Sequence, residues 1–244
     1  MTTATARKAE EHQPSAAVIN LAEVAAKSLP CPDMSLDLNH TALVLVDPQK
    51  GFLDPEGSLW PAVKNGVRGN NVIEHLEWLL DTACSTGMLR VVCPHHHDHR
   101  QAESVGVGRV AAWANALPGR STEHVGEDGD ILPCLTPYLQ DDNAVITGTH
   151  RLCGLANRDL MQELRARRIT QVILAGMCAN LCLEGHLRDL VENGFSVAIV
   201  SDATAGIAID GVDARNHNMH SFRLLANAVW DTRETILRMY GKNV

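Results

Sequence analysis

Three groups of reactive residues each follow a short apolar run of the chain, and they are Asp47, the pair His150 and Arg151, and the pair Cys178 and Cys182. A carboxylate that accepts a thiol proton, a cation that holds the charges in place and a thiol together form a nucleophilic set. Cys182 also falls in the opening turn of an expected helix, where free N–H groups and the helix dipole favour a thiolate. These residue types therefore point to covalent catalysis by cysteine, provided that the fold brings them together.

The apolar runs alternate with segments of helical spacing. The expected strands are 41–47, 89–93, 143–147, 171–175, 196–200 and 228–230, and the expected helices are 72–86, 159–167, 181–192, 212–226 and a last one from the cap at Asp231 to Tyr240. Alternation of this kind, with strands that are apolar throughout, predicts a three-layer α/β/α fold with a mostly parallel, doubly wound, Rossmann-like sheet of about six strands. Ligands bind beyond the carboxyl ends of such strands. All three reactive groups are therefore expected at one edge of the sheet.

Composition excludes several classes of protein. The 244 residues are 45% hydrophobic and 20% charged, which is ordinary for a globular chain. The net charge of -8 argues against nucleic acid as a partner, because phosphate binding needs a basic face. No apolar run approaches the roughly 18 residues of a membrane span, and the first residues lack an apolar signal core. The seven cysteines contain no CxxC pair. We expect a reduced, cytoplasmic protein with no membrane partner.

The chain divides into an extension and one main domain. Residues 1–38 are punctuated by Pro14, Pro30 and Pro32 and are expected to form an N-terminal extension or arm. Residues 39–244 form the expected catalytic domain. Within it, the region 94–140 is rich in Gly, His and charge and is too long for a simple connection. We expect this region to shape a pocket.

Three stretches carry a resemblance to a known family. Residues 42–52, ALVLVDPQKGF, resemble the first-strand signature of the isochorismatase-like cysteine hydrolases. Residues 173–184, ILAGMCANLCLE, are similar to that superfamily's nucleophile segment, and residues 195–205, FSVAIVSDATA, to its following strand and loop. The resemblance runs from about Thr41 to Trp230. Members of that superfamily include nicotinamidases, N-carbamoylsarcosine amidase, biuret and ureidoacrylate amidohydrolases, and isochorismatase.

The resemblance implies roles for particular residues. The family's aspartate falls on Asp47 and its nucleophilic cysteine on Cys182. The family's usual cis peptide falls between Met177 and Cys178, and the backbone N–H groups of Cys178 and Cys182 would form the oxyanion hole.

The third catalytic residue departs from the family pattern. Family members usually carry a lysine after the middle strand, and residues 145–153, VITGTHRLC, contain none. One alignment places that lysine on Thr149 and the other places it on Arg151. We prefer Arg151, because it keeps a positive charge beside the carboxylate, although its guanidinium is bulkier and does not release a proton. If Thr149 holds the position, His150 is the nearest cationic candidate.

Several residues near the strand ends are expected to line the substrate pocket, and they are Gln49, Phe52, Trp60, His95, His97 and His150. Consecutive residues at a strand end point in opposite directions, so few side chains of the His-rich run 95–99 can converge. Three histidines and one aspartate could bind a metal, and whether this run does so stays open, but the expected site contains no metal. We also expect no cofactor.

The expected function is cysteine-dependent hydrolysis of a small amide, ureide or related C–N bond through a thioester. One alternative is hydrolysis of an isochorismate-type vinyl ether, which the presence of Cys182 disfavours because such members work without the cysteine. A second alternative is a catalytically weak or silent ligand-binding homologue, which the missing lysine favours. Because superfamily members usually form homo-oligomers, we expect a dimer or a tetramer. We also expect residues 1–38 to contact a neighbouring subunit.

Overall fold

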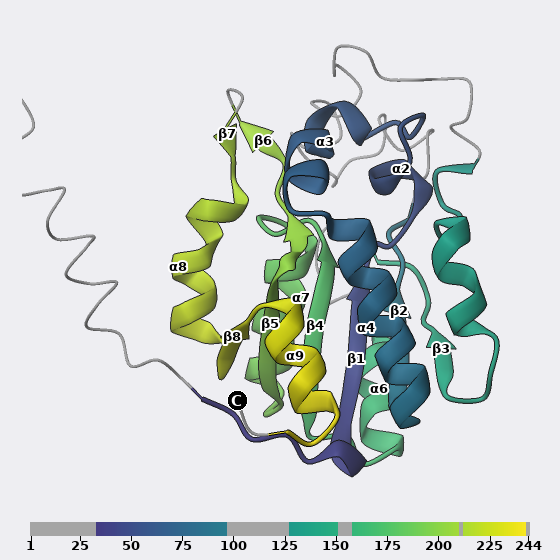
Figure 1. The fold of residues 1–244 in the computed structure, drawn as a ribbon, viewed down its shortest axis with the longest axis vertical. Helices are drawn as coiled ribbons and strands as arrows, with labels where there is room; N and C mark the ends of the chain where they lie inside the picture. Colours follow the sequence, from purple (N-terminus) through teal and green to yellow (C-terminus); the bar gives the residue numbers. More distant parts are fainter. Residues whose placement is uncertain (1–32, 97–126, 151–157, 210–211, 243–244) are drawn as a thin grey trace, which may run out of the picture. The chain divides into compact units, whose positions relative to one another are not determined.

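The computed structural model describes residues 33–96, 127–150, 158–209 and 212–242. Six parallel strands form one sheet, in the order β3-β2-β1-β4-β5-β8 (Figure 1). They are β1 (Thr41–Val46), β2 (Leu89–Cys93), β3 (Ala144–Ile146), β4 (Gln171–Met177), β5 (Ser196–Ala205) and β8 (Ala228–Trp230). A separate antiparallel pair consists of β6 (Ala208–Ile209) and β7 (Val212–Asp213). The expected α/β fold with a parallel sheet of about six strands is confirmed.

Helices cover both faces of the sheet (Figure 1). Their bounds are α2 (Lys50–Leu53), α3 (Trp60–Gly69), α4 (Val72–Thr86), α6 (Arg158–Ala166), α7 (Cys182–Glu192), α8 (Arg215–Leu225) and α9 (Thr232–Met239), with the 3-10 helices η1 (Leu38–His40) and η4 (Pro133–Leu139). Buried side chains of α3, α4 and α9 belong to one apolar cluster, and those of α6, α7 and α8 belong to the other. The sheet is thus the middle of three layers.

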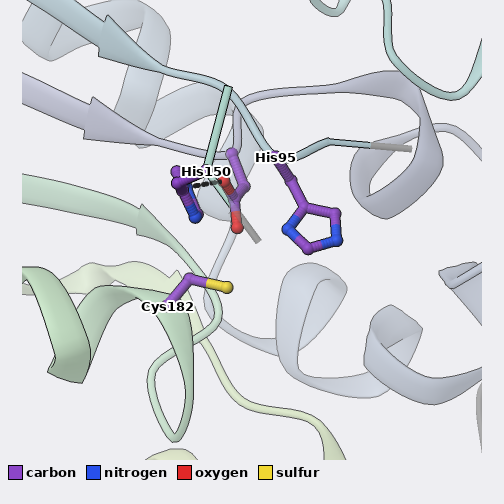
Figure 2. A group of neighbouring side chains, drawn as sticks. His95, His150 and Cys182 are labelled. Atoms are coloured by element: carbon purple, nitrogen blue, oxygen red, sulfur yellow. Dashed lines mark hydrogen bonds and ion pairs between the residues drawn. The ribbon is translucent and has the colours of Figure 1, made fainter. Parts of the chain in front are cut away.

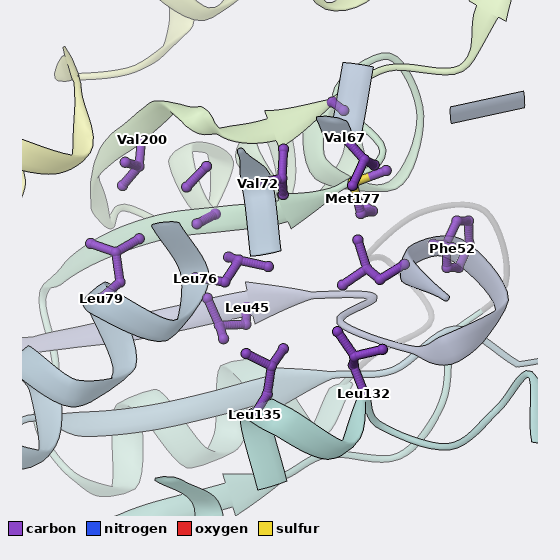
Figure 3. Packing of buried hydrophobic residues seen from close by; sticks show 14 of the residues in the cluster. Leu45, Phe52, Val67, Val72, Leu76, Leu79, Leu132, Leu135, Met177 and Val200 are labelled. Atoms are coloured by element: carbon purple, nitrogen blue, oxygen red, sulfur yellow. The ribbon is translucent and has the colours of Figure 1, made fainter. Parts of the chain in front are cut away.

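Strand β1 lies in the centre of the sheet, and all six of its residues are buried. Leu43 and Leu45 join the cluster of α3, α4 and α9, whereas Ala42, Val44 and Val46 join the opposite one. Figure 3 shows Leu45 among Leu76 of α4 and Leu135 of η4. Because successive side chains of a strand point to opposite faces, a strand covered on both faces has to be apolar throughout.

The strand order reverses between β1 and β4. Strands β2 and β3 lie on one side of β1, and β4, β5 and β8 lie on the other. At such a switch point the loops after the two strands lead away in opposite directions, which leaves a crevice beyond their carboxyl ends. Asp47 follows β1 and Cys178 follows β4, so the fold places both beside this crevice.

The ends of two helices follow from their cap residues, one of which is the expected cap at Asp231. Helix α4 ends at Gly87, which adopts a left-handed φ of 68° and whose N–H donates to carbonyls of the last turn. Asp231 caps α9, since its side chain accepts a hydrogen bond from the N–H of Glu234 at 2.7 Å.

Three expected elements differ by two or more residues at one end, and two α-helices are not predicted by the sequence. The expected helix 212–226 begins only at Arg215, because Val212 and Asp213 pair with β6 instead. Strand β5 continues to Ala205 rather than ending at Val200, and β4 continues to Met177. Helices α2 and α3 lie in a stretch for which the sequence predicts no element.

The start of the described chain packs against β5 and β8. Met34 packs in a small apolar cluster with Ala198, Ala228 and Trp230. Arg238 of α9 forms an ion pair with Asp33 at 3.0 Å. Residues 1–32 of the expected extension lie outside the described residues, so its boundary stays a prediction. Among the residues that the structure describes, no helix has the length and apolar character needed to cross a membrane.

Candidate active site

The first reactive carboxylate lies where β1 ends. Asp47 is fully buried and adopts a left-handed φ of 51°, and its N–H donates to the carbonyl of Cys93 at the end of β2, at 3.0 Å. Aspartate tolerates this backbone region better than most residues. The chain therefore turns sharply at Asp47.

Two histidines lie side by side because the pairing of β2 with β3 resumes beyond the strands. His95 and His150 form an isolated parallel bridge. The N–H of His150 donates to the carbonyl of Pro94 at 3.0 Å, and the N–H of His96 donates to the carbonyl of His150 at 2.7 Å. The two rings lie edge to face, with centroids 5.7 Å apart.

Gln49 fixes the backbone of His95. Its Oε1 accepts a hydrogen bond from the N–H of His95 at 2.7 Å, and its Nε2 donates to the carbonyls of His95 at 3.1 Å and Gly129 at 2.8 Å. The side chain is fully buried. Gln49 therefore holds the backbone of His95 in place, and its expected role in lining the substrate pocket stays a prediction.

The side chains of Asp47 and His150 form a buried pair. Nε2–H of His150 donates to Oδ1 of Asp47 at 2.8 Å, and neither side chain is exposed (Figure 2). Because an ionised carboxylate only accepts hydrogen bonds, Nε2 of His150 carries the proton. Burial alone raises the pKa of Asp47, but the hydrogen bond and charge of His150, the charge of His95 and the nearby Cys182 thiol outweigh burial and lower this pKa below 3.8. Asp47 is therefore ionised at neutral pH.

Cys182 is the first residue of α7, and its side chain points toward His95 and His150 (Figure 2). Ligand atoms of Asp47, His95, His150 and Cys182 all lie within 4.8 Å of one another. Burial, and then the negative charge of Asp47, raise the pKa of the Cys182 thiol well above 9.0, although a hydrogen bond from the backbone N–H of Cys178 lowers it. Burial and Asp47 therefore keep the Cys182 thiol protonated at rest, against the thiolate that a helix start favours.

The end of β4 approaches β1 closely. Gly176 adopts a φ of 109°, and a Cβ atom there would lie 2.1 Å from the carbonyl oxygen of Val46. Only glycine fits this backbone and this spacing. The peptide bond between the next two residues, Met177 and Cys178, is cis, as the family resemblance implies. Gly176 therefore allows the Cys178 loop to lie beside Asp47.

The isochorismatase domain model matches residues 41–234, which is most of the chain. The chain belongs to the isochorismatase family. It is 28% identical over 181 residues to the ureidoacrylate amidohydrolase RutB of Caulobacter vibrioides, which covers 70% of this chain and 79% of that protein. Among solved structures, a cysteine hydrolase from Pseudomonas syringae pv. phaseolicola superposes with a TM-score of 0.71 at 24% identity, covering 88% of this chain and 99% of that one. The YcaC gene product of Escherichia coli, described as an octameric hydrolase of unknown specificity, gives a TM-score of 0.58 at 18% identity, covering 85% and 84%. These structural likenesses show the shared fold.

The other predicted residues of this family member are placed as follows. Phe52 is buried on α2 with its ring edge to face with His95, at a centroid distance of 5.8 Å. Trp60 is buried at the start of α3, with the guanidinium of Arg68 5.1 Å from its ring. Thr149 is exposed. His97 and Arg151 lie outside the described residues, so their expected roles stay predictions.

His186 also lies at this site, although the sequence gives no direct sign of it. It lies one turn after Cys182 on α7, and its Nδ1–H donates to the carbonyl of Cys182 at 2.7 Å. Its ring lies edge to face with His150, at a centroid distance of 4.5 Å. Burial, and then the charge of His150, lower the pKa of His186 to about 4, so it is neutral at pH 7. Its i, i+4 spacing from Cys182 is the signal that could have placed it here.

Proposed function

We propose that this protein hydrolyses a small amide, ureide or related C–N bond through a thioester on Cys182. The observation that carries this proposal is the buried convergence of Asp47, His150 and Cys182 at the switch point of the sheet. A base, its hydrogen-bond partner and a thiol in such an arrangement form an activated nucleophile. The curated relative from Caulobacter vibrioides is named an amidohydrolase of ureidoacrylate, which supports a C–N bond as the target.

The first half-reaction begins with proton transfer from sulfur to carboxylate. Oδ2 of Asp47 has no hydrogen-bond partner among the described residues, and the Cys182 sulfur lies within 4.8 Å of the carboxylate. Asp47 takes the thiol proton as the sulfur attacks the substrate carbonyl, and it then returns that proton to the leaving amine. Because the raised pKa of Cys182 keeps the proton on sulfur at rest, the thiolate forms only when substrate is in place.

The negative oxygen of the tetrahedral intermediate needs hydrogen-bond donors. The N–H of Cys178 already points to the Cys182 sulfur, and the N–H of Cys182 opens α7, where it has no acceptor within the helix. We assign both groups to the oxyanion hole, in which each donor typically contributes about a hundredfold or more to the rate.

The second half-reaction releases the acid. Asp47 removes a proton from a water molecule that attacks the thioester, and the sulfur leaves and recovers its proton from Asp47. His150 keeps Oδ1 of Asp47 occupied throughout, so that Oδ2 serves the moving proton. We propose His150 in the place where family members usually carry a lysine.

An assay of amine or ammonia release across a panel of small amides and ureides tests this function. The wild type should turn over at least one of them, and Cys182→Ala should lower kcat/KM by on the order of a thousandfold or more. Cys134→Ser is the matched control, because Cys134 is an exposed cysteine on η4. It should leave the rate unchanged.

Other results of this assay would contradict the proposal. Turnover of a vinyl ether that survives Cys182→Ala would show isochorismate-type hydrolysis instead. Binding of panel compounds without any turnover would show a silent ligand-binding homologue.

We also propose that the protein is a homo-oligomer in which residues 1–38 contact a neighbouring subunit. Support comes from the Escherichia coli YcaC product, which is described as octameric. Light scattering of the full chain and of a chain lacking residues 1–38 tests this. Equal oligomer sizes would contradict a role for the extension.

A further inference from the structure

Four metal-binding side chains converge at the end of the sheet. Asp47, His95, His150 and Cys182 each offer one ligand atom, and these atoms lie within 4.8 Å of one another. Figure 2 shows the side chains of His95, His150 and Cys182 converging from three separate segments. Each of the four residues belongs to a different segment, and the fold holds the backbone of each segment in place without an ion.

The set has the chemistry that Zn²⁺ prefers. Zinc binds thiolate, imidazole and carboxylate with tetrahedral geometry at about 2.0–2.3 Å, which places neighbouring ligand atoms about 3.5 Å apart. The largest spacing in the structure, 4.8 Å, exceeds this by about 1.3 Å. Small side-chain rotations supply that contraction.

Two buried polar atoms of these side chains lack hydrogen-bond partners in the described part of the chain. Oδ2 of Asp47 and Nδ1 of His150 both belong to fully buried side chains and have no hydrogen-bond partner there. Buried polar atoms are ordinarily satisfied, so each such atom calls for an explanation. An ion seated between the side chains would satisfy the carboxylate oxygen directly.

We propose that these four residues form a reversible inhibitory site for Zn²⁺. Four protein ligands close the coordination sphere and leave no position for a water molecule or substrate, unlike a catalytic zinc site. The ion would displace the Cys182 thiol proton to solvent. It would bind both Cys182, the proposed nucleophile, and Asp47, the proposed base. The inhibition rests on the proposed function, whereas the binding of the ion does not.

Titration of the metal-free protein with Co²⁺ tests the site without any substrate, because Co²⁺ reports thiolate ligation by a near-ultraviolet charge-transfer band and tetrahedral geometry by visible bands. We expect one Co²⁺ per chain, displaced by Zn²⁺. Cys182→Ser should remove the thiolate band, and His95→Ala should weaken Co²⁺ binding by about a hundredfold or more. The matched controls Cys134→Ser and His96→Ala should leave the spectrum and the affinity unchanged.

A protein that shows no thiolate band with Co²⁺, or a band that survives Cys182→Ser, would overturn the proposed site. If the chain is an active hydrolase, Zn²⁺ should inhibit it by at least about a hundredfold at saturation, and a chelator should restore the rate. Inhibition that persists in His95→Ala with unchanged affinity would also overturn the site. A Co²⁺ band from Cys182 in a chain without hydrolase activity would contradict only the proposed function.

Discussion

Nε2 of His150 lies 2.8 Å from Oδ1 of Asp47, and both side chains are fully buried. The resemblance to cysteine hydrolases implies a lysine after β3. In this protein the imidazole of His150 contacts the carboxylate of Asp47 instead. The planar ring occupies one carboxylate oxygen and lies against a second buried ring, that of His186. In this family member the carboxylate of Asp47 is therefore held by His150, whose ring packs edge to face with that of His186.

Replacing His150 should affect both stability and rate. In His150→Ala, the buried carboxylate of Asp47 loses the hydrogen bond and charge that lower its pKa. Removing one partner of a buried pair costs about 3–5 kcal/mol of unfolding free energy. The rate should fall by on the order of a hundredfold or more, because the base is no longer oriented. Urea denaturation and kcat/KM measure the two effects.

His150→Lys is the informative companion variant, because it restores the residue type that the family resemblance implies. An ammonium that reaches Oδ1 of Asp47 should recover at least about a tenth of the native rate. A His150→Ala protein with native stability and native rate would show that the pair does not support catalysis.

Gly176 should tolerate no side chain. Alanine there would place its Cβ 2.1 Å from the carbonyl oxygen of Val46, in a backbone with φ of 109°. We expect Gly176→Ala to lower the free energy of unfolding by about 3 kcal/mol or more. The matched control is Gly194→Ala, where φ is 86° and nothing lies within 4 Å of the added Cβ. It should cost only about 1–2 kcal/mol, and equal losses in urea denaturation would disprove the close-approach argument.

His186 should make the protein less stable in mild acid. Burial lowers its pKa from 6.5 to about 4 in the folded protein, so between these values the unfolded chain binds a proton that the folded chain does not. The free energy of unfolding should therefore fall as the pH decreases from about 6.5 to about 4, by up to about 3 kcal/mol in total. Chemical denaturation at a series of pH values measures this slope.

His186→Leu isolates that contribution. The variant loses the hydrogen bond to the carbonyl of Cys182, which costs about 1 kcal/mol at neutral pH. Its stability should depend less steeply on pH than that of the wild type between about 6.5 and 4, and the two should run in parallel between about pH 7 and 8. The same steepness in both proteins would contradict the neutral, buried state of His186.

The sequence predicts the sheet and most of the helices because its signals there are local. Strand β1 is apolar throughout, and α4 combines helical spacing with Gly87 at its end, so the expected bounds 72–86 match. The sequence does not predict α3, because Gly66 and Gly69 lower its helix propensity and its burial depends on distant contacts. The short hairpin of β6 and β7 likewise carries too few residues for a periodic signal.

The close approach of Asp47 and Cys182 is also predicted, because the carboxyl ends of parallel strands meet at one edge of the sheet. The partner of Asp47 is harder to predict. His150 and Arg151 are adjacent, and which of them faces Asp47 depends on how the chain beyond β3 pairs with the chain beyond β2. Tertiary contacts set that register, so the spacing of the residues along the sequence does not predict it.

The most direct test of the account is the mass of the enzyme during turnover. A reaction quenched in acid should contain protein heavier by the acyl part of the substrate, and peptide mapping should place this addition on Cys182. Cys182→Ala should show neither the addition nor turnover. Turnover with no acyl addition, or an addition on another residue, would contradict nucleophilic catalysis by Cys182 at the Asp47–His150 pair.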